Sequence, residues 1–109
     1  MTSVNILGTK YKVKEDKSLK HTPTDGICKT YDKEIVIRPM ADMLGEEDCV
    51  TSKLDRYKEV IRHEIVHAFF NEAGLSDYCS DERLVEWIAK QFPKMQEAMR
   101  QAGGLNIIW

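Results

Sequence analysis

The first third of the chain contains short runs in which apolar and polar side chains alternate, the pattern of half-buried β-strands. Residues 4–7 and 11–14 are two such runs, and the turn-forming residues 8–10 between them predict a β-hairpin. Residues 15–25 are mostly polar and show no periodicity. We therefore expect a hairpin followed by a loop.

A second pair of strand-like runs follows at residues 26–31 and 34–38, joined by a short polar link. The second run is β-branched and continuously apolar, and Pro39 ends it. We expect residues 34–38 to form an edge strand beside which an extended peptide could pair. A central strand is the alternative, because a continuous apolar run is typical of one. Residues 40–50 predict a short helical turn or an irregular loop.

A long helix is predicted over residues 53–73. Ser52 with Asp55 resembles a capping box at its start, and Gly74 is suited to the position just past its end. Apolar side chains recur along this segment at helical spacing, at Leu54, Tyr57, Ile61, Ile65, Ala68 and Phe69. The spacing indicates a helix that lies centrally in the fold.

After a tight connection at residues 75–80, the apolar spacing predicts a second helix over residues 81–102. Pro93 must kink this helix or restart it. The two glycines that follow end it, and residues 105–109 form an apolar tail that packs back, pairs as a strand or binds a partner. Hairpins followed by helices predict an α+β fold.

Composition limits the classes of function. At 109 residues and 42% hydrophobic, the chain has material for one core, so residues 1–109 are expected to form a single domain. The net charge is −2 and no basic stripe is present, which disfavours a nucleic-acid partner. No apolar segment is long enough for a signal or a membrane span, so we expect a cytoplasmic protein without membrane contact. The oligomeric state is not indicated.

The cysteines support a reducing compartment. Cys28, Cys49 and Cys79 are odd in number, widely spaced and without a C-x-x-C motif. Both a disulfide framework and a cysteine-based zinc site are therefore disfavoured. We expect three free thiols with no ligand role.

The most informative segment is His63-Glu64-Ile65-Val66-His67, an H-E-x-x-H motif within the predicted long helix. Residues four apart on a helix share a face, so both imidazoles can bind one metal ion, and zinc is the ion expected. Glu64 projects from a neighbouring strip, where a general base can reach a metal-bound water without ligating the metal. Buried histidines beside a glutamate would be costly without a cation.

A catalytic zinc site has three protein ligands, so a third is needed. No histidine follows His67, which excludes a third histidine of the metzincin type. The downstream candidates are Asp77, Cys79, Asp81, Glu82 and Glu86. Only Glu82 and Glu86 pair four residues apart on a predicted helix, beside its apolar stripe. One of them can ligate zinc while the other accepts the free ring N–H of a ligating histidine.

Residues 63–67 followed by Asp81-Glu82-Arg83-Leu84-Val85-Glu86 resemble the gluzincin arrangement, in which H-E-x-x-H precedes N-E-x-x-x-D. The small size, the preceding hairpins and the run from Val85 to Pro93 resemble the ImmA/IrrE-like metallopeptidases of phages and prophages. The resemblance covers residues 26–95.

This resemblance implies a minimal zincin-like fold, with a small antiparallel or mixed sheet packed on a central H-E-x-x-H helix and a C-terminal ligand helix. It also implies that Glu82 is the third ligand and that Glu86 is the carboxylate behind a ligating histidine. Asp81 and Glu86 replace the asparagine and aspartate of the family pattern, and Val85 replaces a small residue.

The function expected from these residues is a zinc-dependent peptidase that cleaves an intracellular protein or peptide, with Glu64 activating the zinc-bound water. The alternative is a metal-stabilised module that binds a host or phage regulator with little or no turnover. Tyr78 is the candidate oxyanion helper because it is the nearest in sequence to the ligand helix. Tyr31 and His21 are weaker candidates.

Overall fold

A computed structural model of the chain describes residues 2–44 and 50–105, in which strands precede helices. The elements are β1 (Thr2–Ile6), β2 (Thr9–Glu15), the 3-10 helix η1 (Lys17–His21), β3 (Gly26–Lys29), β4 (Glu34–Ile37), the 3-10 helix η2 (Met40–Asp42), α1 (Val50–Glu72), α2 (Ser76–Cys79) and α3 (Glu82–Gln101). This order confirms the predicted α+β class.

The four strands of the described residues form one mixed sheet in the order β1-β2-β4-β3. Both predicted hairpins are present, because β1 pairs antiparallel with β2 and β3 pairs antiparallel with β4. The hairpins are joined by parallel pairing of β2 with β4, with Val13 opposite Ile35. The sheet is therefore assembled from two local units and one long-range pairing.

Both hairpin turns differ from their predicted positions. The first consists of Leu7 and Gly8, whose φ angles of 51° and 92° are both positive, as a type I′ turn requires. The side chain of Asn5 accepts a 2.7 Å hydrogen bond from the Gly8 amide. In the second hairpin Lys29 is opposite Glu34, so the turn comprises residues 30–33 rather than two residues.

The prediction of an edge position for residues 34–38 is wrong. β4 is hydrogen-bonded to β2 on one side and to β3 on the other. Its three apolar residues are no more than 2% exposed, which requires cover on both faces of the sheet. The continuous apolar run is thus the mark of a central strand. β3 is at the edge instead.

The long predicted helix is present as α1, but it begins earlier than expected, at Val50. Ser52 is within the helix, so the proposed capping box does not mark its start. The predicted end is confirmed, because Gly74 has a φ of +75° and Leu75 donates to the Phe70 carbonyl oxygen at 2.9 Å. The polar loop and the irregular segment before α1 contain η1 and η2, and residues 45–49 are outside the described part.

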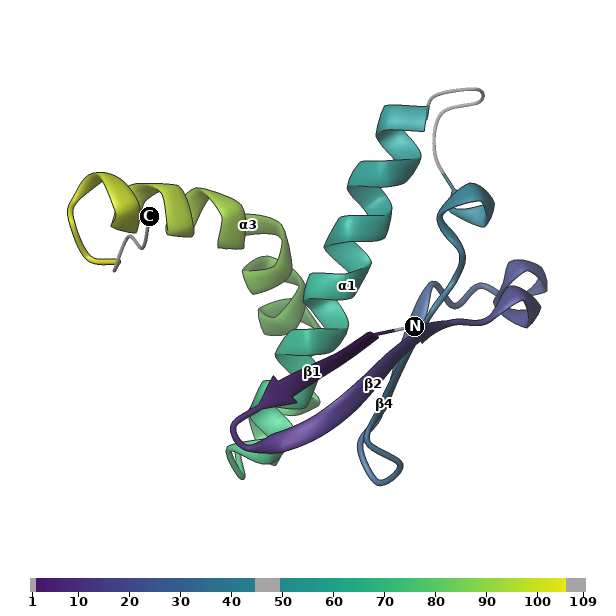
Figure 1. Cartoon of the computed structure of the whole chain (residues 1–109), viewed down its shortest axis with the longest axis horizontal. Helices are drawn as coiled ribbons and strands as arrows, with labels where there is room; N and C mark the ends of the chain where they lie inside the picture. Colours follow the sequence, from purple (N-terminus) through teal and green to yellow (C-terminus); the bar gives the residue numbers. More distant parts are fainter. Residues whose placement is uncertain (1, 45–49, 106–109) are drawn as a thin grey trace.

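The connection after α1 contains the one-turn helix α2, and α3 follows it. The Asp81 side chain caps α3 by accepting from the Leu84 amide at 3.1 Å. Helix α3 continues through Pro93, and its axis turns along its length (Figure 1). Within residues 2–44 and 50–105, no helix is both long and apolar enough to cross a bilayer. The tail residues 106–109 are outside the described residues.

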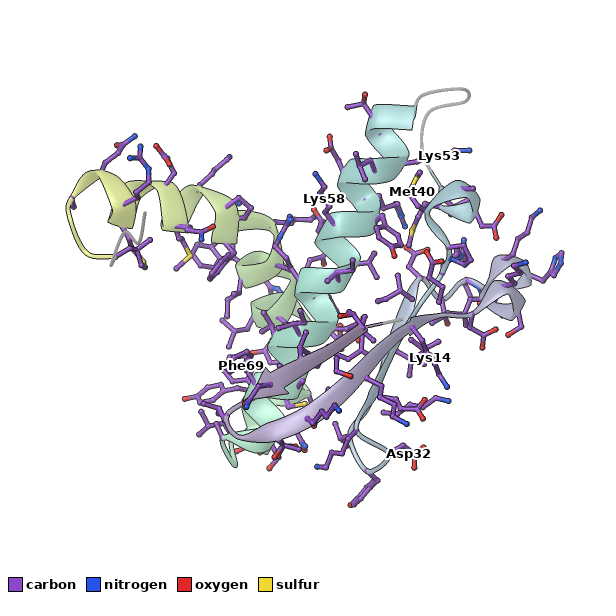
Figure 2. The ribbon with its side chains drawn as sticks, in the orientation of Figure 1. Lys14, Asp32, Met40, Lys53, Lys58 and Phe69 are labelled. Carbon is purple, nitrogen blue, oxygen red and sulfur yellow. The ribbon has the colours of Figure 1, made fainter. Side chains whose placement is uncertain are left out.

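Helix α1 lies between the sheet and α3 (Figure 1). The buried core between sheet and helix comprises Ile6, Tyr11, Ile35, Ile37, Met43 and Ala68. Lys14 points to the other side of the sheet, away from α1 (Figure 2), where it pairs with Glu34 at 2.8 Å. The alternation in the first strands thus separates a core face from a charged outer face.

A partly buried polar network joins the sheet to the C-terminal end of α1. The hydroxyl of the fully buried Tyr11 donates to Glu72 Oε2 at 2.6 Å, and Lys33 Nζ donates to the same oxygen at 2.8 Å. These hydrogen bonds hold the pKa of Glu72 down to about 2, and burial raises the pKa of Tyr11 to about 12. Lys33 also offsets the unfavourable position of a carboxylate at a helix C-terminus.

The Glu72 network predicts a pH dependence of stability. Folding lowers the pKa of Glu72 from an ordinary 4.5 to about 2. The ionised carboxylate therefore contributes fully to the free energy of unfolding above pH 4.5, and this contribution is lost as pH falls toward 2. We expect Glu72→Gln to lower the urea midpoint at pH 7 and the difference from wild type to shrink across that interval. Glu97→Gln, which breaks an exposed pair within α3, is the control and should cost less. If Glu72→Gln lowered stability equally at pH 7 and pH 2.5, the lowered pKa of Glu72 would be contradicted.

Candidate metal centre

Three side chains from two helices converge on one point. His63 and His67 are one turn apart on α1, and their Nε2 atoms are 3.2 Å apart. Glu82, the first residue of α3, places Oε2 3.1 Å from His63 Nε2 and Oε1 2.9 Å from His67 Nε2. The candidate ligand atoms of the three residues all lie within 4.8 Å of one another. The structure therefore brings together the two motif histidines and the acid suggested by the resemblance.

The packing of α3 against α1 is what places Glu82. Val85 and Ala89, one and two turns into α3, are fully buried. Arg62 on α1, the residue before the motif, donates from Nε to the Ala89 carbonyl oxygen at 2.6 Å. These contacts fix the start of α3 next to the histidines, and the Asp81 cap sets where the helix begins.

The donor set fits a zinc ion. Ligands bound at about 2.0–2.2 Å in a tetrahedron are about 3.3–3.6 Å from one another, and the Nε2 atoms of His63 and His67, 3.2 Å apart, are already close to that spacing. Glu82 approaches the two histidines with different carboxylate oxygens, either of which can be the ligand. The imidazoles are largely buried, at 22% and 12% side-chain exposure, whereas Glu82 is 67% exposed. Two nitrogens and one carboxylate that meet at a half-open surface leave a side from which water or a substrate can approach.

Glu64 lies beside this cluster but is not part of it. The residue is only 7% exposed, and it lines two adjoining hollows of about 380 and 290 Å³ that also contain Gly26 and His63. Burial, with a further contribution from the Glu82 charge, raises the pKa of Glu64 to about 7. A carboxylate with this pKa can both take up and release a proton near neutral pH.

Gly26 allows the edge strand to approach Glu64. A Cβ atom at this position would be 2.8 Å from Val60 Cγ1 and 3.1 Å from Glu64 Cγ, so a larger residue would displace its neighbours. The role of Gly26 was not foreseen from the sequence. A glycine at the start of a predicted strand was the available signal, because it often marks a close approach of the backbone.

The residue before Gly26 fixes the strand in place. Asp25 accepts hydrogen bonds from Arg56 on α1 at 2.6 and 3.0 Å, and its other carboxylate oxygen is 3.5 Å from the buried Arg38. Arg38, which follows β4, also donates to the carbonyl oxygens of Thr22 and Thr24. This set of contacts ties β3, β4 and α1 together on one side of the hollows.

Two cysteines also line the smaller hollow. Cys28 is on β3 and Cys79 ends α2, and both are free thiols, as expected. Burial raises the pKa of Cys28 to about 12 and that of Cys79 in the same direction, and the nearby carboxylates contribute. Cys49 is outside the described residues. Cys79 is one of the downstream ligand candidates from the sequence, but no motif indicates that it lies beside His67, because a chain turn creates this proximity.

The other site residues suggested by the sequence lie outside the cluster of His63, His67 and Glu82. Glu86 lines the larger hollow with His63, but its carboxylate pairs with Lys90 at 3.2 Å. Tyr78 is half exposed and its ring packs on Phe70, 5.7 Å between centroids. It does not line either hollow. Tyr31 is 98% exposed in the β3–β4 turn, and His21 ends η1.

A scan against protein-family models, a search of curated proteins and a search of solved structures each found no match to this chain.

The first prediction from the site concerns Gly26. We expect Gly26→Ala to lower stability by about 1–3 kcal/mol, because the new methyl group overpacks against Val60 and Glu64. The double variant Gly26→Ala/Val60→Ala removes the tightest contact and should be less destabilised than the sum of the two single variants, as measured by urea unfolding. Gly104→Ala, where the nearest atom is 3.4 Å away, is the control. Strict additivity of the two losses would show that the close approach does not exist.

The second prediction from the site concerns the Glu64 carboxyl group. Because its folded-state pKa is about 7 against an ordinary 4.5, ionisation opposes folding, and stability falls as pH rises through this interval. In protein kept metal-free with a chelator, we expect Glu64→Gln to be more stable than wild type by about 3 kcal/mol at pH 8 and by little at pH 4.5. Asp55→Asn, at an exposed position on α1, provides the control. If the stability difference between Glu64→Gln and wild type did not grow with pH, the raised pKa of Glu64 would be refuted.

Proposed function

We propose that this chain is a zinc-dependent peptidase. The observation that carries the proposal is the convergence of His63, His67 and Glu82, with donor atoms within 4.8 Å, beside the buried carboxyl group of Glu64. These three residues would hold the ion. When bound, zinc acts as a Lewis acid toward a water molecule and the scissile carbonyl group. The intact H-E-x-x-H motif and the gluzincin-like acid on the following helix support the same function.

Glu64 is the general base in this proposal. Its carboxylate takes a proton from the attacking water and passes it to the leaving amine, which requires a pKa near the working pH. Burial provides that pKa, and a nearby cation would lower it toward the ionised form that a base needs. The neighbouring Gly26 backbone keeps Glu64 buried without adding a side chain to the hollow.

β3 is the strand beside which an extended peptide substrate would bind. Among the described strands it pairs with β4 alone, and its residues Gly26, Ile27 and Cys28 line the hollow that contains Glu64 and the histidines. An unpaired strand edge can align a peptide through backbone hydrogen bonds. The peptide would then lie beside β3, not beside β4 as expected from the sequence.

One observation favours the second function, a binding module without turnover. An apolar hollow of about 630 Å³ lies between α1 and α3, lined by residues that include the 41% exposed Phe69 and the 45% exposed Phe92. Figure 2 shows Phe69 on the C-terminal half of α1. A hollow lined by exposed apolar side chains can receive apolar side chains of a protein partner. Binding of a partner in this hollow does not require the Glu64 carboxylate.

Metal uptake and peptide cleavage together test the proposal. We expect reconstituted wild-type protein to bind one zinc ion per chain and to cleave members of a random peptide library, with products detected by mass spectrometry. Glu64→Gln should retain zinc and lose cleavage, and His63→Ala should lose zinc. Failure of the reconstituted wild type to take up zinc would end the proposal. Zinc uptake without cleavage in both wild type and Glu64→Gln would favour the binding module.

A further inference from the structure

Cys79 makes two contacts with His67 that no sequence motif anticipates. Its Sγ atom is 3.7 Å from Nδ1 of the His67 ring and 3.4 Å from the His67 carbonyl oxygen. Nδ1 is the ring nitrogen on the far side from the cluster, because Nε2 is the atom that faces His63 and Glu82. Cys79 therefore touches the back of a candidate ligand, not the metal position itself.

The hydrogens of these groups can be assigned from their chemistry. A thiol has one weak donor and a weak acceptor sulfur, and a carbonyl oxygen has a second lone pair besides the one used in the helix. If the thiol hydrogen points to the His67 carbonyl oxygen, the nearer of the two acceptors, the sulfur can accept the hydrogen of His67 Nδ1. The His67 ring then carries its proton on Nδ1 and presents the Nε2 lone pair to the cluster.

We propose that Cys79 is a positioning residue that holds His67 in the tautomer and ring orientation required for metal binding. The inference rests on the proposed zinc site. Metal-bound histidines usually donate their second N–H to a carboxylate, a backbone carbonyl or a water, and loss of that partner weakens metal binding by about 10–100-fold. Here the partner is a thiol on α2.

The choice of a thiol follows from the charges already present. Glu64 and Glu82 place two carboxyl groups around the histidines, and a third carboxylate behind His67 would increase the repulsion between them. Glu86, the acid expected in this role, is paired with Lys90. A neutral thiol accepts the N–H without adding charge. The nine-residue link from α1 to α3 positions it, because Gly74 turns the chain and α2 returns Cys79 to the histidine.

Zinc affinity, measured by competition with a chromophoric chelator, tests the role directly. We expect Cys79→Ala to weaken zinc binding about tenfold and Cys79→Ser, which keeps a donor and an acceptor, to recover part of the loss. Cys28→Ala is the matched control, since this thiol lines the same hollow from β3 and packs against the core. It should leave zinc affinity unchanged, whatever it costs in stability.

The tautomer gives a readout that does not depend on bound zinc. In the metal-free wild type, the Glu82 carboxylate oxygen 2.9 Å from His67 Nε2 favours a proton on Nε2, so the comparison is made in Glu82→Ala protein. There, at a pH where the imidazole is neutral, nitrogen-15 NMR should show His67 protonated on Nδ1, and shifted toward Nε2–H when Cys79→Ala is added. Unchanged zinc affinity in Cys79→Ala and an unchanged tautomer when it is added to Glu82→Ala would overturn the inference while leaving the zinc site in place. If wild type binds no zinc, the proposed function fails, and the NMR result still decides the role of Cys79.

Discussion

The attachment of α3 to α1 is the contact on which the site depends. The H-E-x-x-H motif supplies two donors from one helix turn, but Glu82 is 15 positions beyond His67, and only tertiary packing brings it back. Burial of Val85 and Ala89, together with the Arg62 hydrogen bond, achieves this. Burying two small or β-branched side chains allows the helices to approach closely, which a bulky residue at either position would prevent.

A second constraint acts from the sheet side. The Asp25 contacts with Arg38 and Arg56 hold the beginning of β3 against α1, and Gly26 lets the backbone pass close to Glu64. The candidate base is thus buried by main chain on one side and by its own helix on the other. The raised pKa of Glu64 is a consequence of this enclosure, with the Glu82 charge as the smaller cause.

Local patterns predicted the elements well and their long-range relations poorly. Alternation and glycine positions located both hairpins and the end of α1, since these depend on neighbours in sequence. The edge assignment of residues 34–38 was wrong because strand order is set by the parallel β2–β4 pairing. The continuous apolar run is a local sign of a central strand, but it does not show which strand pairs there. The histidines and Glu82 followed from motif spacing and a resemblance. The role of Gly26 could not be identified, because its contacts with Val60 and Glu64 join residues 34 and 38 positions apart. Cys79 could be named as a candidate ligand but not as a partner of the far side of the His67 ring, because a chain reversal brings the two together.

The parallel pairing between the hairpins also bears on how the chain folds. Each hairpin closes a short loop, but Val13 meets Ile35 only after the whole segment between them is arranged. Before non-local contacts of this kind contribute stability, the chain must lose the entropy of loop closure. Such contacts therefore slow folding. The surface beside Glu64 depends on a non-local contact as well, because Gly26 of β3 packs against Glu64, 38 positions further along the chain. A partly folded chain can therefore contain the motif helix before it contains a cleft.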